Sequence, residues 1–495
     1  MTEPSATYDV VVVGAGLSGI GVARRLSRQR PDLRYVVLEA RAATGGTWDL
    51  FRYPGVRADS DMVTLGYADR PWREPVMLAP AAEILRYVRD ASAAGGVDEH
   101  VRLNHRVTAI SWSGSDARWS VDVERTDTGQ RLQLTSRWVF AAAGYYRYDT
   151  GYTPRFDGLD RFGGTVVHPQ RWPDDLDVTD RRVVVIGSGA TAITLVPALA
   201  ERAALVTMVQ RTPTYVLPVA GEDKLVGRFE RVLGPERGYA AARRFKVGTQ
   251  AALWRFCRRH PRTARRLIRR INVARLPAGF DVDTHFDPPY DPWDQRMCIA
   301  ADGDFFAAIR EGSVQLVTDS VTRFTERGLL LTSGRELDAD VVVTATGLVM
   351  QPFGGFPIAV DDTPVTLPEH VVYKGFMLDG VPNFGFAIGY TNASWTLKVD
   401  LVADHFTRLV GYLRDHGDDA CVPVRPAGLR VRPLLELGAG YVRRAQDALP
   451  RQGDVDPWRM TMRYRDDVAM LHDAPVLDDS LRLLRARSRA GQDAS

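Results

Sequence analysis

The stretch YDVVVVGAGLSG (residues 8–19) decides the fold of the N-terminal part of the chain. Its first half is a short apolar run rich in β-branched side chains, which predicts a buried parallel strand over Tyr8–Val13. Gly14, Gly16 and Gly19 follow at once in the spacing G-x-G-x-x-G, and residues 20–29 predict a helix. Strand, glycine turn and helix in this order are typical of a dinucleotide-binding Rossmann unit.

Each part of this unit has a physical role in holding a dinucleotide. The first glycine permits the tight turn, the second lets backbone approach a pyrophosphate, and the third lets helix and strand pack closely. Ser18 belongs to the same turn, where unpaired N–H groups at the helix start can bind phosphate. A second strand, predicted over Arg34–Leu38, ends at Glu39, which can accept hydrogen bonds from a ribose diol. An N-terminal unit of this kind usually holds FAD.

A second unit begins at Arg182. The run RVVVI (residues 182–186) predicts a buried strand, residues 187–192 have the spacing G-x-G-x-x-A, and residues 193–202 predict a helix. The next strand, Leu205–Val209, ends in Gln210-Arg211-Thr212 rather than in an acid. An acid would repel a 2′-phosphate, whereas a guanidinium can donate two parallel hydrogen bonds to it. This site is therefore predicted to bind NADPH. The alternative is that Arg211 pairs with a surface carboxylate. The predicted NADPH residues here are Gly187, Ser188, Gly189, Thr191, Ala192, Arg211 and Thr212.

Length and composition limit the other possibilities. A chain of 495 residues is too long for one hydrophobic core, and a net charge of +3 is too small to indicate a nucleic-acid partner. Cys257, Cys298 and Cys421 have no C-x-x-C or metal-ligand spacing, which indicates a reducing compartment and no metal site. No signal peptide and no apolar run of membrane-spanning length is found, so we expect a cytoplasmic protein.

Between the two glycine motifs lies FGGTVVHPQRWP (residues 162–173), with the pattern F-x-G-x-x-x-H-x-x-x-W-P. Its fixed positions are Phe162, Gly164, His168, Trp172 and Pro173. With this pattern the sequence resembles the flavin-dependent type I Baeyer–Villiger monooxygenases, whereas related enzymes that oxidise nitrogen and sulfur usually carry Tyr or Phe in place of Trp172. The alternative is a surface connector with packed aromatic side chains. We expect His168 to link the two nucleotide domains rather than to transfer a proton.

The loop GGTWDLFRYPGVRADSD (residues 45–61) matches a second pattern of that family, G-x-W-x-x-x-x-Y-P-G-x-x-x-D. Because proline and glycine break regular structure, we expect a long ordered loop. The resemblance implies that this loop runs along the flavin, and that Asp59 approaches the flavin ring and pairs with a catalytic Arg. The alternative is that Asp59 caps a turn. The remaining FAD contacts implied by the resemblance are Gly46, Thr47, Trp48 and the backbone near Val107.

The segment YDPWDQRMCIAADGDFFAAI (residues 290–309) resembles one branch of the family, the bacterial ethionamide-activating monooxygenases. The resemblance implies that Arg296 lies over the flavin and that Gln295, which replaces a common Lys, belongs to the NADPH site. Two dinucleotide sites imply hydride transfer from NADPH to FAD. Because the sequence has no C-x-x-C dithiol to take electrons from the reduced FAD, the electron acceptor is O₂. A guanidinium keeps a flavin peroxide anionic, so we expect oxygen insertion beside a ketone carbonyl to give an ester or lactone, with sulfide oxidation as a side activity.

The predicted fold is α/β, with two Rossmann-like dinucleotide-binding domains, for FAD and NADPH, and a helical insertion in the NADPH domain. The predicted boundaries are 1–147 (FAD), 148–218 (NADPH), 219–294 (insertion), 295–347 (NADPH) and 348–495 (FAD and C-terminal segment). Residues 239–275 predict a helical pair with one apolar face, built from Phe245, Leu253, Trp254, Phe256, Leu267, Ile268 and Ile271. The arginines of this insertion form either a solvated helix face or a patch for a membrane surface or anionic partner.

Two other functions stay open. One is a monooxygenase that mainly oxidises nitrogen or sulfur, which Trp172 and the context of Arg296 disfavour. The other is a non-catalytic flavoprotein used as an interaction module, which the intact glycines at both sites disfavour.

Overall fold

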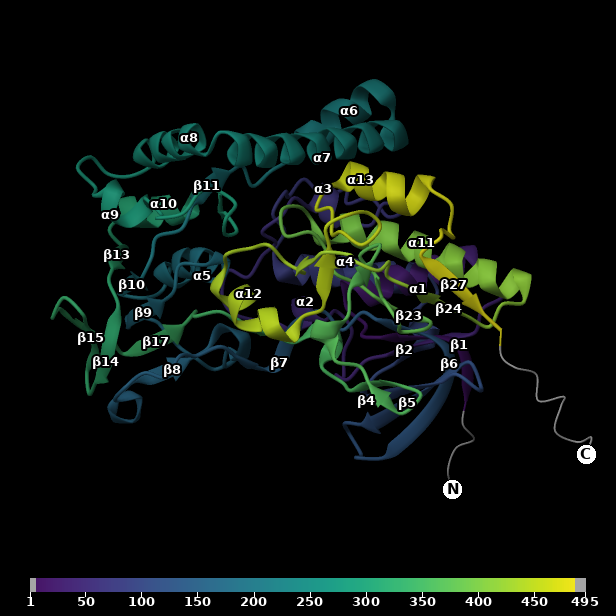
Figure 1. Cartoon of the computed structure of the whole chain (residues 1–495). Helices are drawn as coiled ribbons and strands as arrows, with labels where there is room; N and C mark the ends of the chain where they lie inside the picture. The colour runs from purple at the N-terminus through teal and green to yellow at the C-terminus, as the bar shows by residue number, and fades with distance from the viewer. Residues whose placement is uncertain (1–5, 486–495) are drawn as a thin grey trace, which may run out of the picture.

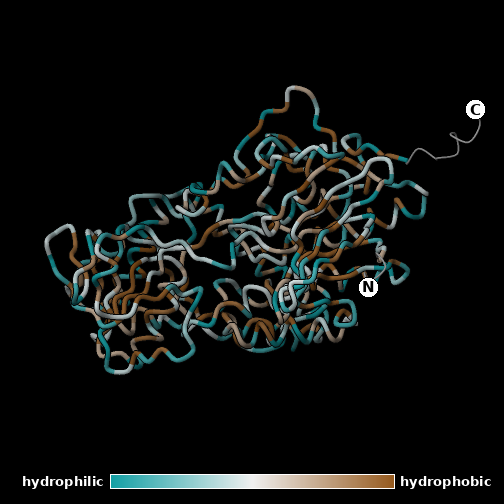
Figure 2. Tube along the Cα trace, turned by 90° about the horizontal axis from the view of Figure 1, so that it is seen from below, coloured by the Kyte–Doolittle hydropathy of each residue, from teal (hydrophilic) through white to brown (hydrophobic). Residues whose placement is uncertain are grey.

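The protein is described by a computed structural model that covers residues 6–485. Figure 1 shows two lobes side by side, each built on its own sheet, with a layer of helices along one edge of the molecule. Hydrophobic segments gather inside both lobes (Figure 2). We call the lobe that contains the N-terminal strand the first lobe and the other the second lobe.

The first lobe contains an 11-stranded sheet with a parallel centre. β1 (Thr7–Val13) pairs in parallel with β2 (Tyr35–Leu38) on one side and with β6 (Arg131–Ala141) on the other. This confirms the predicted N-terminal strand. Helix α1 (Leu17–Gln29) begins three residues before its predicted start, because Gly16, in extended conformation, already serves as the N-cap.

Further strands complete this sheet on both sides. β3 (Val101–Arg102), β4 (His105–Ser113) and β5 (Arg118–Arg125) come before β6 in the chain, and β19 (Ile358–Val360), β20 (Thr363–Pro364), β21 (Val372–Tyr373), β22 (Met377–Leu378) and β23 (Phe384–Phe386) come late. β23 pairs in parallel with β6, so the chain returns to the first lobe after building the second. Helices α4 (Ala81–Ala94) and α11 (Trp395–His416) pack against α1 and bury one face of the sheet.

The second lobe has a parallel sheet of five strands in the order β13-β10-β9-β17-β8. These strands are β13 (Val314–Thr318), β10 (Leu205–Gln210), β9 (Arg182–Ile186), β17 (Val341–Thr344) and β8 (Thr165–Val167). Helices α5 (Ala190–Ala200) and α10 (Asp304–Arg310) pack on it, and β14 (Val321–Thr325), β15 (Gly328–Leu331) and β16 (Glu336–Asp338) form a small sheet beside it. The α/β fold with two Rossmann-like units is therefore confirmed.

Two short strands connect the lobes. β7 (Tyr146–Gly151) runs from the first lobe toward the second, β18 (Leu348–Met350) runs back, and the two pair antiparallel. The predicted boundaries near residues 147 and 347 fall at these strands. The division of the chain into domains stays a prediction.

The insertion is helical, as predicted. It contains α6 (Leu225–Leu233), α7 (Pro235–Arg259), α8 (Pro261–Val273) and α9 (Val282–Phe286), and the parallel strands β11 (Val216–Val219) and β12 (Cys298–Ala301) flank it. The prediction of one buried apolar face is wrong for Phe245, Leu253 and Leu267, which are exposed. On α7 the buried side contains Tyr239, Ala242, Arg243, Lys246 and Cys257 instead, and on α8 it contains Ala264 and Ile268.

The C-terminal segment packs back onto the first lobe. It contains β24 (Ala420–Pro423), β25 (Val431–Pro433), α12 (Gly440–Ala445), β26 (Arg451–Gly453), α13 (Tyr464–Val468) and β27 (Leu481–Leu484). Trp458 and Leu471 from this segment are buried in the core of that lobe. Within residues 6–485, no helix combines the length and the apolar character needed to cross a bilayer.

Candidate active site

The turn between β1 and α1 brings backbone close to backbone. A Cβ atom on Gly19 would lie 1.8 Å from the carbonyl oxygen of Gly14, so no other residue fits there. Gly16 lies against Gly46, since a Cβ atom on Gly16 would be 3.4 Å from the Gly46 Cα. No side chain caps the start of α1, which leaves its first N–H groups directed at the space where a pyrophosphate binds in a Rossmann unit. The glycine turn therefore fits FAD.

Glu39 lies where the ribose of a dinucleotide is expected. One carboxylate oxygen accepts a hydrogen bond from the Ala15 N–H (2.8 Å) and the other from the Arg41 N–H (2.9 Å). Burial raises the pKa of Glu39, and these two hydrogen bonds oppose that shift. The Glu39 carbonyl accepts from the His105 N–H at 2.7 Å, which places β4, and buried Val107 two residues along it, beside the same turn.

Two aromatic side chains from distant segments reach the predicted FAD residues. The Trp395 Nε1–H donates to the Ser18 Oγ (2.8 Å), and its ring stacks on Tyr145 with centroids 4.9 Å apart. The Tyr148 hydroxyl lies 3.0 Å from the Thr47 Oγ1. Trp48, in the short helix α2 (Thr47–Leu50), packs against the core of the first lobe. The loop predicted over residues 45–61 thus contains one helical turn.

The second glycine turn has the same form with more open space. Gly189 is the N-cap of α5, and a Cβ atom there would meet no atom within 4 Å. The Ser188 hydroxyl donates to the Thr212 carbonyl at 3.0 Å, which joins the ends of β9 and β10. Thr191 and Ala192 lie in the first turn of α5.

Arg211 is exposed at the end of β10 and forms no ion pair with any residue in 6–485. The alternative pairing with a surface carboxylate is therefore not observed in this part of the chain. The neighbouring Gln210 is buried, and its amide donates to the His285 carbonyl (2.9 Å) and to the Thr318 Oγ1 (3.0 Å). These bonds fix the strand end, while the Arg211 guanidinium stays available to a 2′-phosphate.

Arg296 and Asp59 meet at the border of the two lobes. The Arg296 Nη2 donates to the Asp59 Oδ1 at 2.9 Å, and each side chain is about one-third exposed (33% and 34%). The Asp59 carboxylate raises the pKa of Arg296 above its ordinary value, against the opposing effect of burial. The guanidinium therefore stays charged at every physiological pH. The structure brings together the pair that the resemblance implied.

Each partner of this pair is held by contacts between the lobes. Near Asp59, the Arg57 Nη1 donates to the Asp304 Oδ2 of α10 (2.6 Å). Near Arg296, the Asp294 carbonyl accepts from the Gly438 N–H (2.7 Å) of the C-terminal segment, and its carboxylate pairs with Arg258 at the end of α7. Gln295 is half-buried in this loop, directly before Arg296.

Three tyrosines interact electrostatically with the guanidinium, and the motifs identified none of them. Tyr145 and Tyr146 lie where the chain leaves the first lobe, and Tyr441 comes from α12. Ring centroids are 4.3 Å apart for Tyr145 and Tyr146, and 6.1 Å apart for Tyr146 and Tyr441. Burial raises the pKa of Tyr145 to about 12 and raises the pKa values of the other two phenols as well. All three are neutral hydrogen-bond donors at neutral pH.

His168 contacts both connecting strands. Its Nε2 lies 3.1 Å from the Gly347 carbonyl, and its Nδ1 accepts from the Gln170 N–H at 3.2 Å. Its ring fills the space next to Gly151, where a Cβ atom would lie only 2.0 Å from the His168 Cε1. Burial lowers the pKa of His168, so the ring is neutral with both nitrogens engaged. This geometry supports a linking role.

The other fixed positions of the F-x-G-x-x-x-H-x-x-x-W-P pattern belong to the second lobe rather than to the site at Arg296. Phe162 packs on Phe324 with ring centroids 5.7 Å apart, and Gly164 lies against the Asp340 carbonyl. Trp172 packs against the core of that lobe, and Pro173 is half-buried.

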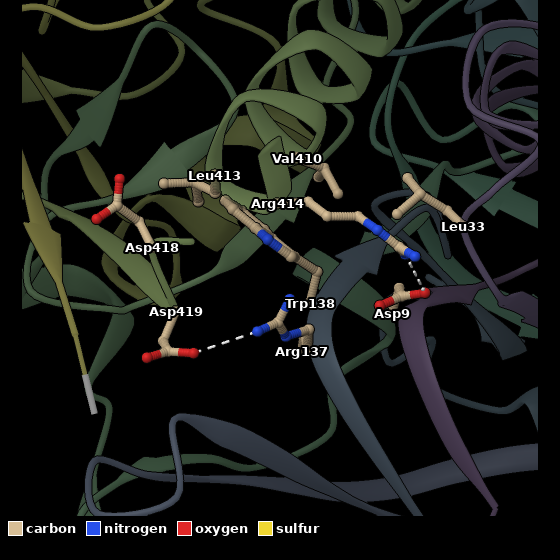
Figure 3. Close-up of a pocket in the computed structure, with 9 residues that line it drawn as sticks. All are labelled: Asp9, Leu33, Arg137, Trp138, Val410, Leu413, Arg414, Asp418 and Asp419. Carbon is tan, nitrogen blue, oxygen red and sulfur yellow. Dashed lines mark hydrogen bonds and ion pairs between the residues drawn. The ribbon is translucent and has the colours of Figure 1, made fainter. Parts of the chain in front are cut away.

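A small cavity lies elsewhere in the first lobe (Figure 3). Its volume is about 10 Å³, room for one water molecule, and the ion pairs Arg414–Asp9 and Arg137–Asp419 lie at its walls. Asp9 stands near the start of β1, whereas the glycine turn follows its end, so this cavity is no part of the dinucleotide site. Within residues 6–485, no cluster of three metal-ligating side chains occurs, and Cys257, Cys298 and Cys421 are buried and free.

Comparison with known proteins agrees with this geometry. A model described as an NAD(P)-binding Rossmann-like domain matches residues 12–68. The chain is 45% identical over 485 residues to the FAD-containing monooxygenase EthA of Mycobacterium tuberculosis (strain ATCC 25618 / H37Rv), covering 98% of this chain and 99% of that protein. It is 44% identical over 486 residues to the putative FAD-containing monooxygenase MymA of the same strain, covering 97% and 98%.

Solved structures with the same fold include a steroid monooxygenase bound to NADP, with a TM-score of 0.77 at 22% identity, covering 97% of this chain and 100% of that one. Another is OTEMO in complex with FAD and NADP, with a TM-score of 0.74 at 21% identity and the same coverage. A third is cyclohexanone monooxygenase, with a TM-score of 0.74 at 19% identity. At these identities the structures show the fold alone. The chain therefore belongs to the family of FAD-containing monooxygenases that includes EthA and MymA, and it has the fold of the type I Baeyer–Villiger monooxygenases.

Proposed function

We propose that this FAD-containing monooxygenase oxidises NADPH and inserts one oxygen atom of O₂ next to the carbonyl carbon of a ketone. The products are an ester or lactone, NADP⁺ and water. The observation that carries this proposal is the Arg296–Asp59 pair, which joins the loop after α2 to the segment just before β12. Oxidation of sulfides is proposed as a side activity.

Bound FAD, once reduced, supplies the activation of O₂. The residues of the chain supply charge and orientation. The Arg296 guanidinium stabilises the negative charge that develops on oxygen during insertion into the ketone, because it is permanently charged and only one-third exposed (33%). Asp59 orients that guanidinium through their hydrogen bond of 2.9 Å. The neutral phenols of Tyr146 and Tyr441, which are electrostatic neighbours of Arg296, are proposed to donate hydrogen bonds to a substrate oxygen.

The cofactor contacts remain proposals, supported by their place at the two glycine turns. For FAD these are Gly14, Gly16, Ser18, Gly19, Glu39, Gly46, Thr47, Trp48, Asp59 and Val107. For NADPH these are Gly187, Ser188, Gly189, Thr191, Ala192, Arg211, Thr212 and Gln295. A cytoplasmic location also stays a prediction, and so does contact with a membrane surface through the Arg-rich insertion.

The experiment is product analysis of Arg296→Ala. Purified enzyme with bound FAD is given NADPH, O₂ and a panel of linear, cyclic and aryl ketones plus thioethers. We expect the variant to oxidise NADPH and release hydrogen peroxide without forming ester, since the charge that supports insertion is lost. Arg327→Ala is the matched control, because Arg327 is an exposed arginine of the second lobe with an ion pair of its own, 3.5 Å from Asp338.

Three results would contradict the proposal. Ester formation by Arg296→Ala near the wild-type rate would remove Arg296 from the reaction. Wild-type enzyme that oxidises only amines or sulfides would establish the N- or S-oxidising alternative. An enzyme that retains FAD but consumes no NADPH would favour the non-catalytic flavoprotein.

A further inference from the structure

Helices α7 and α8 carry the main charge imbalance of the chain. Between Glu236 and Asp281 the sequence has thirteen Lys and Arg residues and no acidic residue. The formal net charge of the whole chain is only +3, so the rest of the chain sums to 3 − 13 = −10. A concentration of positive charge on one part of a surface attracts an anionic partner to that part.

Five of these cations are neutralised within the molecule. They are Arg243, Lys246, Arg258, Arg265 and Arg269, each paired with at least one aspartate. The other eight form no ion pair with any residue in 6–485, and all eight are exposed. They are Arg237, Arg244, Arg255, Arg259, Arg262, Arg266, Arg270 and Arg275.

Helical spacing places most of the unpaired cations on one surface. On α8, Arg262, Arg266 and Arg270 recur every four residues and so share a face, while Ala264 and Ile268 are buried on the other face. On α7, exposed Arg244, Arg255 and Arg259 lie opposite buried Ala242, Lys246 and Cys257. Figure 1 shows α7 and α8 almost end to end along one edge of the molecule. We call Arg244, Arg255, Arg259, Arg262, Arg266 and Arg270 the basic face.

Apolar side chains are exposed on the same helices. Of eleven large apolar side chains that are exposed within residues 6–485, six lie on α6, α7 and α8. They are Val232, Leu233, Phe245, Leu253, Leu267 and Val273. Phe245 and Leu267 are 51% and 49% exposed and each directly follows an arginine of the basic face. Arginine mixed with exposed Phe, Leu and Val is typical of helices that lie in a membrane interface. Nucleic acid binding, by contrast, uses the cations alone to neutralise phosphates.

We propose that the basic face docks this enzyme on a membrane surface that contains anionic lipids. The arginines lie at the lipid phosphates, and Phe245 and Leu267 enter the boundary between headgroups and acyl chains. Contact is peripheral, since within residues 6–485 no helix can span the bilayer. The inference deepens the membrane contact proposed for the insertion and does not depend on the oxygenation chemistry.

The test is sedimentation of the FAD-loaded full chain with lipid vesicles. We expect binding to vesicles of equal parts phosphatidylglycerol and phosphatidylcholine, no binding to pure phosphatidylcholine, and weaker binding as salt rises. Each arginine near an anionic bilayer contributes about a factor of five in affinity. The triple variant Arg262→Gln/Arg266→Gln/Arg270→Gln should therefore bind about a hundredfold more weakly. Phe245→Ser/Leu267→Ser should weaken the vesicle binding that remains at high salt, because salt does not screen the apolar contribution of these two side chains.

The matched control is Arg106→Gln/Arg323→Gln/Arg335→Gln, with the same loss of charge. These exposed arginines lie on β4, on β14 and just before β16, away from α7 and α8 (Figure 1). The control should bind like the wild type. Equal weakening by both triple variants, or binding to pure phosphatidylcholine, would overturn the proposal. The proposal would also be overturned if the enzyme bound a DNA or RNA duplex more tightly than vesicles and if Phe245→Ser/Leu267→Ser did not change the affinity for the duplex. Ketone turnover measured without vesicles tests the reaction separately, so either proposal can fail alone.

Discussion

Arg211→Ala is expected to weaken the use of NADPH and leave the use of NADH unchanged. The guanidinium is exposed at the end of β10 and has no ion-pair partner within residues 6–485, so no internal interaction competes with a 2′-phosphate. A hydrogen bond to a charged group contributes roughly 1.5–3 kcal/mol. Its loss should raise the Michaelis constant for NADPH by about 10- to 150-fold. NADH lacks the 2′-phosphate, so its Michaelis constant should not change.

The assay is steady-state oxidation of both nicotinamides by enzyme of verified FAD content. Arg211→Lys should give an intermediate Michaelis constant for NADPH, because it keeps the charge but loses the planar fork. Arg202→Ala is the control, since Arg202 is an exposed arginine of the same lobe that pairs with Asp177 at 2.9 Å. An unchanged preference for NADPH over NADH in Arg211→Ala would refute the assignment of the 2′-phosphate to this residue.

Three further changes test the site and the connection between the lobes. Asp59→Asn should lower ester formation about tenfold or more and raise hydrogen peroxide release, because Arg296 loses its charged partner; product analysis against NADPH consumption measures this. Gly151→Ala should lower the free energy of unfolding by about 1–3 kcal/mol in urea titration, because its Cβ atom would meet the His168 ring. Gly248→Ala, in open space on α7, should not destabilise the protein. Tyr441→Phe should raise the Michaelis constant for the ketone several-fold without changing NADPH oxidation in its absence; an unchanged constant removes this hydroxyl from substrate binding.

Both glycine turns could be predicted because their geometry depends on residues close in sequence. The strand at Arg182–Ile186 has the predicted bounds, and β1 begins one residue before its predicted start. In each unit a buried strand must turn within a few residues and pack against the helix that follows. Steric contact between neighbours, such as Gly19 against the Gly14 carbonyl, decides which residues are possible. Such constraints leave a regular spacing that a single sequence reveals.

The rest of the site depends on contacts between distant residues, which leave no regular spacing. Trp395 reaches Ser18 across 377 positions, and Tyr441 reaches the surroundings of Arg296 from a segment that no motif covers. The prediction of which face of α7 is buried was wrong for a related reason. Helical period identifies which residues share a face, but here Lys246 rather than Phe245 turned inward, because Asp61 and Asp223 supply carboxylates at that place.

The Arg296–Asp59 pair is fixed from two sides by structures that belong to different lobes. On one side, Arg57 binds Asp304 of α10, which ties the loop of Asp59 to the second lobe.

On the other side, α7 is anchored at its N-terminal half to the first lobe. The Arg243 Nη1 donates to the carbonyls of Val63 (2.6 Å) and Gly66 (2.8 Å). At its far end Arg258 holds Asp294, two residues before Arg296. The helix whose outer face we propose to rest on a membrane thus contacts both the first lobe and the loop that carries Arg296. The Arg296–Asp59 pair therefore lies at the interface between the lobes, and we expect movement of one lobe against the other to change its geometry.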